Sequence, residues 1–424
     1  MVGINSVACS RIKAPVAITT ASFANKCFSV LVILLPFLQQ YIGVGNVVSL
    51  GEILVAPFIL GFLIADGKII GTLVDRSLFF FYLVSIGLSV IGGFTFDYFS
   101  FGEFWTLVAR LVFYAGLILV ARRHFSWDAV RDLYLLLVTV AALYLVIQYV
   151  YHLASGGYLP IVISDSLVFS PEKTFDTWTD KYQWYFRPSS LFLEPSYYSL
   201  FTLPALVIFA IGEKDKSLPR FVLLVVTYAL SSANSGLLAS IVVLIFFLVF
   251  KKKTQLDFLV ASLMLLVAVL YLPFHNVDWI TAAGERLAAG GSLDNRVIRG
   301  FICFGFLDSF HQVVGVGLNN LGSYMSYNAL STGFDSDGLN YCATWIQTLN
   351  YSGIIGFCAL VFYVGSLFKE CNGRMSRALC IVLIVVMAYE SILFSYRFAF
   401  MVILLEGFIR SEKAAAECEA EVQQ

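Results

Sequence analysis

The segment Arg187-Pro188-Ser189-Ser190-Leu191-Phe192-Leu193-Glu194-Pro195-Ser196-Tyr197-Tyr198 marks a boundary between two kinds of sequence. A polar, aromatic stretch precedes it, and an apolar run long enough for a membrane helix follows. Glu194-Pro195 suits a helix start, because proline at the first helical position needs no amide partner and an acidic residue favours the positive end of the helix dipole. Glu194 is therefore either a simple cap or, with Arg187, part of a polar site at the membrane surface.

The composition indicates a membrane protein. Hydrophobic residues make up 59% of the chain and charged residues 13%, and the mean hydropathy is +0.84. A soluble domain carries about 25% charged residues. The net charge of −1 and the lack of basic tracts argue against a nucleic-acid partner. No P-loop, HExxH helix or C-x-x-C pair occurs, so we expect no metal and no cofactor.

Apolar runs of about 17–25 residues can span a bilayer. We predict spans at 27–44, 47–66, 77–97, 104–121, 131–152, 195–212, 218–233, 235–250, 256–274, 343–368, 377–395 and 397–410. The predicted fold class is an all-α polytopic membrane protein, one integral domain over residues 1–424 with about 12 transmembrane helices. Two large external loops, 153–194 and 275–342, are expected to contain short interfacial helices.

Lysine and arginine test this layout, because they gather in short cytoplasmic loops. Basic residues precede the first predicted span and follow the second, fourth, sixth, eighth, tenth and last. The short loops 45–46 and 98–103 carry none. Both termini are therefore predicted to be cytoplasmic, with residues 411–424 as a solvated tail.

The second external loop carries three arginines, Arg286, Arg296 and Arg299. We expect Ser292 or Asp294 to cap a helix that runs to about Phe310. Arg296 and Arg299 would share one face of that helix, because residues three apart are neighbours on a helix surface. A half-apolar helix of this kind is typical of an interfacial or re-entrant element.

Ionisable residues inside membrane spans are candidates for function because their burial in lipid is costly. Glu52, Arg110, Glu390 and Arg397 all fall in the outer third of their predicted spans. We predict a polar cavity that opens outward, with Arg187, Glu194, Arg296 and Arg299 at its mouth. The alternative is structural pairing, such as Glu52 with Arg110, that only holds helices together.

Arginines near the bilayer surface suit a phosphate-bearing ligand, because guanidinium stays charged and binds oxyanions through two hydrogen bonds. The aromatic loop suits sugars or, alternatively, interfacial anchoring. Together these features predict glycosyl transfer from a polyprenyl-diphosphate donor. The arginines would stabilise the leaving group, and a carboxylate or a neutral base would accept the hydroxyl proton.

Four short motifs, in this order, resemble the bacterial O-antigen and capsule polymerase family (Wzy type), with O-antigen ligases as distant relatives. They are the segment from Arg187 to Ser196, the turn from Leu230 to Gly236, the arginine-bearing loop leading to Gly315-Val316-Gly317, and the stretch from Asn340-Tyr341 to Gly353-Ile354-Ile355-Gly356. The resemblance covers most of the chain, although each motif is short.

The resemblance implies transfer of a growing glycan from undecaprenyl diphosphate to a new lipid-linked repeat unit, without metal or nucleotide, at the outer face of the bacterial inner membrane. Arg187 and an arginine of the second loop would hold diphosphate, and Glu194 would lie at the site. Ligase relatives carry a histidine where this chain has Asn340-Tyr341. That departure favours a polymerase and leaves the base unassigned, with Glu194 and His311 as candidates. The expected site-lining residues are Tyr197, Asn340, Tyr341, Glu52, Arg110, Glu390 and Arg397.

Two other functions stay open: a ligase-like lipid-linked glycosyltransferase, and a flippase for lipid-linked oligosaccharides. The absence of a clear repeat between the two halves and the outer position of the charges argue against a transporter. The expected partners are an undecaprenyl-diphosphate-linked oligosaccharide and the lipid bilayer. Whether a chain-length regulator also binds stays open, as do the sugars and the linkage.

Overall fold

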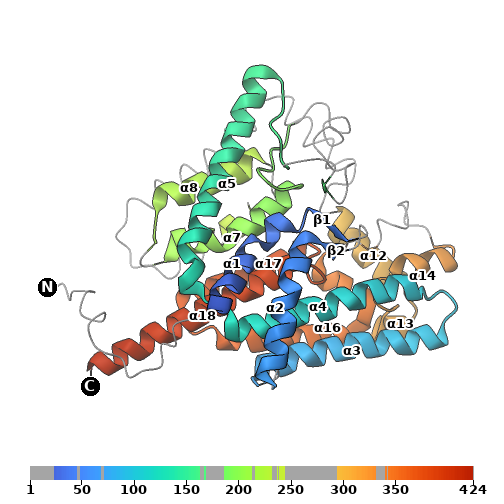
Figure 1. Ribbon diagram of the computed structural model, residues 1–424. Helices are drawn as coiled ribbons and strands as arrows, with labels where there is room; N and C mark the ends of the chain where they lie inside the picture. Colours follow the sequence, from blue (N-terminus) through green and yellow to red (C-terminus); the bar gives the residue numbers. More distant parts are fainter. Residues whose placement is uncertain are drawn as a thin grey trace.

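The structure is a computed structural model (Figure 1) that describes residues 23–44, 48–67, 71–162, 167–168, 186–212, 215–231, 236, 238–243, 294–330, 340 and 342–423. Arg286, Tyr341, the predicted span 256–274, most of the span 235–250 and most of the first external loop lie outside these ranges.

Long helices dominate the described residues. They are α1 (Phe23–Leu38), α2 (Leu50–Asp66), α3 (Leu73–Thr95), α4 (Phe101–His124), α5 (Trp127–Ser155), α7 (Pro195–Ile211), α8 (Leu218–Leu230), α16 (Thr344–Glu370), α17 (Arg374–Tyr389) and α18 (Tyr396–Gln423). Each overlaps one predicted span. Four of them, α3, α4, α5 and α16, are long and apolar enough to cross a membrane. The chain is thus a helical protein with membrane-type helices, and twelve spans remain a prediction.

Helix α18 occupies the centre of the bundle. It packs against α1, α4, α5, α7 and α17, and its residues from Phe398 to Phe408 are buried on every side. Apart from Glu406, this segment is apolar on all sides, as expected for a helix in such an enclosed position. The predicted tail is helical, because α18 continues without a break to Gln423, and its residues from Lys413 to Glu417 are exposed.

The connection between α1 and α2 differs from the prediction. Strands β1 (Ile42–Val44) and β2 (Val48–Ser49) form an antiparallel hairpin where the end of one span and the start of the next were expected. Ser49 and Glu52 then form a reciprocal capping box, and α2 begins at Leu50. The local capping chemistry therefore sets the start of α2.

In its described part, residues 294–330, the second predicted external loop contains a π-helical turn (Asp294–Ile298) followed by α12 (Arg299–Phe306), α13 (Ser309–Val314) and α14 (Leu321–Tyr327). The predicted single helix to Phe310 is wrong. Leu307 is extended, and Asp308 starts α13 by accepting hydrogen bonds from the amides of Phe310 (2.9 Å) and His311 (3.0 Å). In Figure 1 these short helices lie beside the ends of α3 and α4.

Helix α16 is broken at Gly353, whose φ of +62° and ψ of −167° are not helical. The break frees backbone carbonyl groups, and the segment after α13 binds them. Val316 donates to the carbonyl of Asn350 and Gly317 to that of Tyr351, both at 3.0 Å. A Cβ atom at Gly315 would lie 2.2 Å from the Tyr351 oxygen, so only glycine allows this approach.

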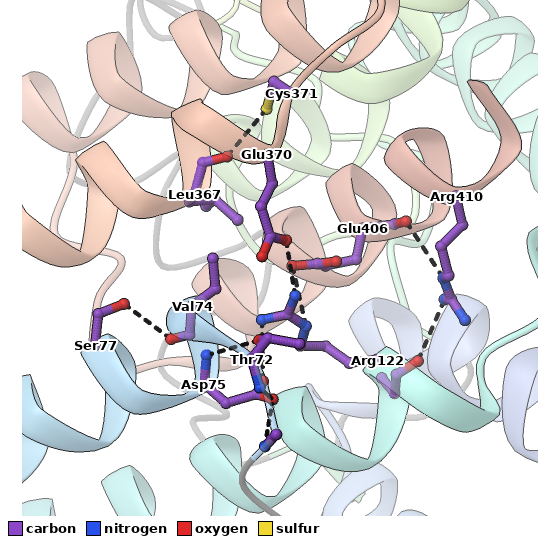
Figure 2. A network of polar contacts seen from close by, with 12 residues as sticks. Thr72, Val74, Asp75, Ser77, Arg122, Leu367, Glu370, Cys371, Glu406 and Arg410 are labelled. Atoms are coloured by element: carbon purple, nitrogen blue, oxygen red, sulfur yellow. Dashed lines mark hydrogen bonds and ion pairs between the residues drawn. The ribbon is translucent and has the colours of Figure 1, made fainter. Parts of the chain in front are cut away.

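A buried charge network joins four helices at one end of the bundle (Figure 2). Arg122 of α4 contacts Asp75 of α3 (3.0 Å), Glu370 of α16 (2.8 Å) and Glu406 of α18 (3.3 Å). Arg410 adds a hydrogen bond to the carbonyl of Ala121 (3.3 Å). The basic-residue pattern predicts that these helix ends lie on one side of the membrane, and in the structure they meet at one end of the bundle.

Candidate functional site

The opposite end of α16 carries a second polar group, built around an ion pair between Arg296 and Glu390. Arg296 lies in the π-helical turn, and Glu390 directly follows α17. The start of α16 binds both backbones: Ala343 donates to the carbonyl of Arg296 (2.8 Å), and Thr344 donates to that of Glu390 (3.0 Å). The pair is thus held by backbone contacts, and α16, about 40 Å long, separates it from Arg122.

Arg397 brings a second cation to this group at the start of α18. Its Cζ atom lies 4.7 Å from the centroid of the Tyr197 ring, a cation–π contact. Its Nη2 donates to the carbonyl of Ser391 and its Nε to Oγ of Ser395, both at 3.1 Å. Glu390 and Glu194 both lie within electrostatic reach of the guanidinium.

Glu194 and Pro195 form the predicted helix boundary. Pro195 is the first residue of α7, which confirms that prediction, and Glu194 is the N-cap residue with φ of −138° and ψ of 145°. Its carboxylate makes no capping hydrogen bond and instead accepts one from Oγ of Ser196 (3.2 Å). Glu194 is thus the N-cap residue by its backbone, and its carboxylate is not engaged in a capping hydrogen bond.

Glu52 is not paired with Arg110, so the prediction of that particular pair is wrong. The Glu52 carboxylate accepts hydrogen bonds from Oη of Tyr114 (2.5 Å) and from the amide of Ser49 (2.8 Å). The Arg110 side chain is exposed on α4. Tyr396 lies between the Glu52–Tyr114 pair and Arg397 in electrostatic terms, because it is within electrostatic reach of Tyr114, Arg397 and Glu194.

Asn340 belongs to the same end of the bundle. Its carbonyl accepts hydrogen bonds from Nε2 of Gln347 (2.9 Å) and from Oη of Tyr351 (3.3 Å). Gln347 also accepts a hydrogen bond from Ser391, next to Glu390 (3.1 Å). The sequence interpretation missed Thr344, Gln347 and Ser391. The signal was present as polar residues at 344, 347 and 351, a helical spacing along an otherwise apolar span.

Two other predicted arginines lie on neighbouring elements. Arg299 is buried one turn after Arg296, beside Cys303 and Cys342, neither of which is in a disulfide. Burial raises the pKa of the Cys342 thiol to about 12. Arg187 is half-buried, and its Nε donates to the carbonyl of Ser231 at the end of α8 (3.3 Å).

His311 lies in a different environment from the Arg296–Glu390 pair. Its Nδ1 is 2.5 Å from Oδ2 of Asp308, and the rings of Phe96, Tyr98 and Tyr324 surround the imidazole. Its Nε2 is buried, and in the described part of the chain no hydrogen-bond partner faces it. Asp308, which the sequence interpretation missed, holds the ring from the N-cap position of α13.

The polar group at the Glu390 end therefore contains Glu194, Tyr197, Arg296, Glu390 and Arg397, with Glu52 and Tyr114 connected through Tyr396. We call this set the Glu390 cluster. Among the described residues, no three His, Cys, Asp or Glu side chains are grouped to hold a metal ion. No protein-family model matches the chain, and no curated protein matches it.

Proposed function

We propose that the protein polymerises a surface polysaccharide (O-antigen, capsule or exopolysaccharide) at the outer face of a bacterial inner membrane. It would transfer a growing glycan from undecaprenyl diphosphate to a new lipid-linked repeat unit. The observation that supports this proposal is the Glu390 cluster, in which arginines, carboxylates and a tyrosine from separate helices converge at one end of a bundle of apolar helices.

The arginines of this region suit an anionic ligand. Arg296, Arg299 and Arg397 supply three cations, and Glu52, Glu194 and Glu390 supply three carboxylates, so the formal charges balance in the absence of substrate. A diphosphate group would compete with the carboxylates for the guanidinium groups. Arginine suits this role because its planar, permanently charged group binds phosphate oxygens in pairs.

In the proposed reaction, the acceptor hydroxyl oxygen attacks the anomeric carbon of the donor glycan. A new C–O bond forms, the bond from the anomeric carbon to the diphosphate oxygen breaks, and undecaprenyl diphosphate leaves. Guanidinium groups aimed at the leaving group stabilise the charge that develops on it, which is usually the largest catalytic contribution.

The hydroxyl proton needs an acceptor, and we assign this role to Glu194. Its side chain is half-buried, makes no capping hydrogen bond to α7, and lies within electrostatic reach of Arg397. A general base must come within hydrogen-bond reach of the proton that it removes. His311 fits less well, because its Nε2 is enclosed by aromatic rings and its Nδ1 is held by Asp308.

A transporter of lipid-linked oligosaccharides is the second candidate, and the break in α16 favours it. Transporters often build their substrate sites from discontinuous membrane helices, and Gly353 interrupts α16. However, the segment after α13 already binds the freed carbonyls of Asn350 and Tyr351. This occupation favours a structural role for the break.

Purified protein in liposomes with lipid-linked repeat units separates these functions. Elongation without nucleotide sugar is the expected result, and Glu194→Gln should abolish it while leaving the protein folded. Translocation of repeat units without elongation would support the transporter instead. Arg123→Ala serves as the matched control, because Arg123 contacts Asp66 at the other end of the bundle.

A further inference from the structure

Helix α12 places its side chains in the opposite way from a helix on a water-facing surface, with its charged residue inward and its large apolar residues outward. Its charged residues point into the protein: Arg299 is only 6% exposed, and Arg296, in the turn before it, pairs with Glu390. Its large apolar residues point outward, and Phe301 is 55% exposed. The exposed set is Ile298, Phe301, Ile302 and Phe306, a spacing that forms one stripe along a helix.

The inward face of α12 is fixed to α16. A Cβ atom at Gly300 would lie 2.4 Å from Cγ2 of Ile346, so the two backbones pack closely. Nδ2 of Asn350 donates to the carbonyl of Gly300 (3.1 Å), and Cys303 is buried on the same side. The helix therefore cannot turn its apolar stripe inward without breaking these contacts.

The stripe continues onto surfaces that belong to membrane-type helices. On α13, Phe310 and Val313 are exposed, and the Phe310 ring lies 5.8 Å from that of Phe96 at the end of α3. The α13 segment also docks on the break in α16. Both α3 and α16 are long and apolar enough to cross a membrane. We therefore expect the stripe to face hydrocarbon, as the exposed surfaces of α3 and α16 would.

The stripe begins beside Arg296. Ile298 is exposed and lies two residues after Arg296, whose side chain is 27% exposed, whereas Arg299 is buried on the inward face. A ligand with an anionic head and a hydrocarbon chain can therefore contact Arg296 and the stripe at once. At the other end of α12, the half-exposed carboxylate of Asp308 limits the depth of the segment to the interface.

We propose that the stripe formed by Ile298, Phe301, Ile302, Phe306, Phe310 and Val313 binds the hydrocarbon chain of the lipid-linked substrate. This inference rests on the proposed function for the identity of the lipid, whose diphosphate Arg296, in the turn before α12, would hold. The substrate then reaches the Glu390 cluster sideways from the bilayer, past the start of α12.

A photo-crosslinking benzophenone amino acid placed at position 301 tests this proposal in liposomes that contain phospholipid and undecaprenyl diphosphate. The control position is Phe80, an exposed phenylalanine on α3. We expect the ratio of polyprenyl to phospholipid adducts to be about tenfold higher at position 301, the factor that about 1.4 kcal/mol of preference produces. Excess inorganic diphosphate should lower that ratio at position 301 only.

Equal ratios at the two positions would mean that the stripe contacts bulk lipid alone, and would overturn the proposal. Adducts to protein, or no lipid adduct at position 301, would overturn it as well. An elongation assay on the same liposomes separates the two hypotheses. Enriched polyprenyl adducts without elongation would support the lipid site and contradict the polymerase function. Elongation with equal ratios would support the polymerase function and contradict the lipid site.

Discussion

Arg296 and Glu390 form an ion pair although 94 residues separate them in the sequence. The Glu390 side chain is only 4% exposed, whereas that of Arg296 is 27% exposed. The carboxylate is thus buried and depends on its partner, while the guanidinium still reaches the surface. This asymmetry lets a structural role of the pair be separated from a functional role of the arginine.

Replacing Arg296 by Ala should leave the Glu390 carboxylate buried without its counter-ion. Removing one partner of a buried pair typically costs about 3–5 kcal/mol of stability. Because Arg296 is partly exposed, we expect a loss of about 3 kcal/mol in the free energy of unfolding. The double variant Arg296→Ala/Glu390→Gln should recover most of this loss, because no buried charge is left. Thermal unfolding in detergent measures both effects.

Elongation should not recover in the double variant, because the proposed diphosphate contact of Arg296 is still missing. Recovery of both stability and elongation would show that the pair is only structural.

At the other end of the bundle, neighbouring arginines differ sharply in their surroundings. Arg122 is 10% exposed and contacts three carboxylates, whereas Arg123 is 36% exposed and contacts only Asp66 among the ion pairs described. Arg122→Ala should destabilise the protein by about 3–5 kcal/mol, and Arg123→Ala by no more than about 1 kcal/mol. The midpoints of thermal unfolding compare the two, and equal shifts would contradict a structural role for the network.

The sequence predicts the long helices well because local composition determines them. Proline at the first position of α7 and the apolar run after it suffice to place that helix. The break at Gly353 was not predictable, because it depends on backbone contacts from the segment after α13, more than thirty residues earlier in the chain. Local patterns carry no information about such distant contacts.

The candidate site shows the same limit. Glu390 and Arg397 were singled out because ionisable residues in apolar spans need partners, and Arg296 because it lies in the second predicted external loop; the structure places Arg296 and Glu390 in an ion pair. Charge pairing failed for Glu52, where a neutral hydroxyl of Tyr114 supplies the hydrogen bond in place of Arg110. A buried carboxylate accepts any well-placed donor, and the sequence does not show which donor lies within reach.

The contact between Arg397 and Tyr197 predicts a graded response at position 197. Tyr197→Phe keeps the aromatic face and should leave stability and elongation close to those of the unmodified protein. Tyr197→Ala removes it and should lose about 1 kcal/mol of stability through the cation–π contact, with a lower rate of elongation. If Phe and Ala behave alike, the hydroxyl group matters and the ring face does not.

Asp308 gives a pH dependence that can be measured directly. Partial burial opposes ionisation, but hydrogen bonds from the His311 amide, the His311 ring and the Phe310 amide lower the pKa of Asp308 below its ordinary value of 3.8. A carboxyl group with a lowered pKa stabilises the folded state above its unfolded pKa, and this contribution disappears as the pH falls through the folded pKa.

Asp308→Asn should therefore reduce the midpoint of thermal unfolding at pH 7, and the difference from the unmodified protein should shrink as the pH falls and vanish below the folded pKa, which is lower than 3.8. Asparagine caps helices as well as aspartate does, so the substitution isolates the contribution of the charge beside His311. A difference that stays constant with pH would show that the charge contributes nothing.

Gly353 and Gly365 lie in the same helix and provide a matched pair. A Cβ atom at position 353 would lie 2.2 Å from the Val313 oxygen, in a backbone conformation with φ of +62°. At position 365 a Cβ atom would meet nothing within 4 Å. Gly353→Ala should cost at least about 2 kcal/mol through strain and overlap. Gly365→Ala should stabilise α16 by about 0.5–1 kcal/mol, because alanine loses less freedom in a helix. Opposite shifts in the unfolding midpoint are expected, and a tolerated alanine at position 353 would mean that the loop after α13 does not hold the break in α16.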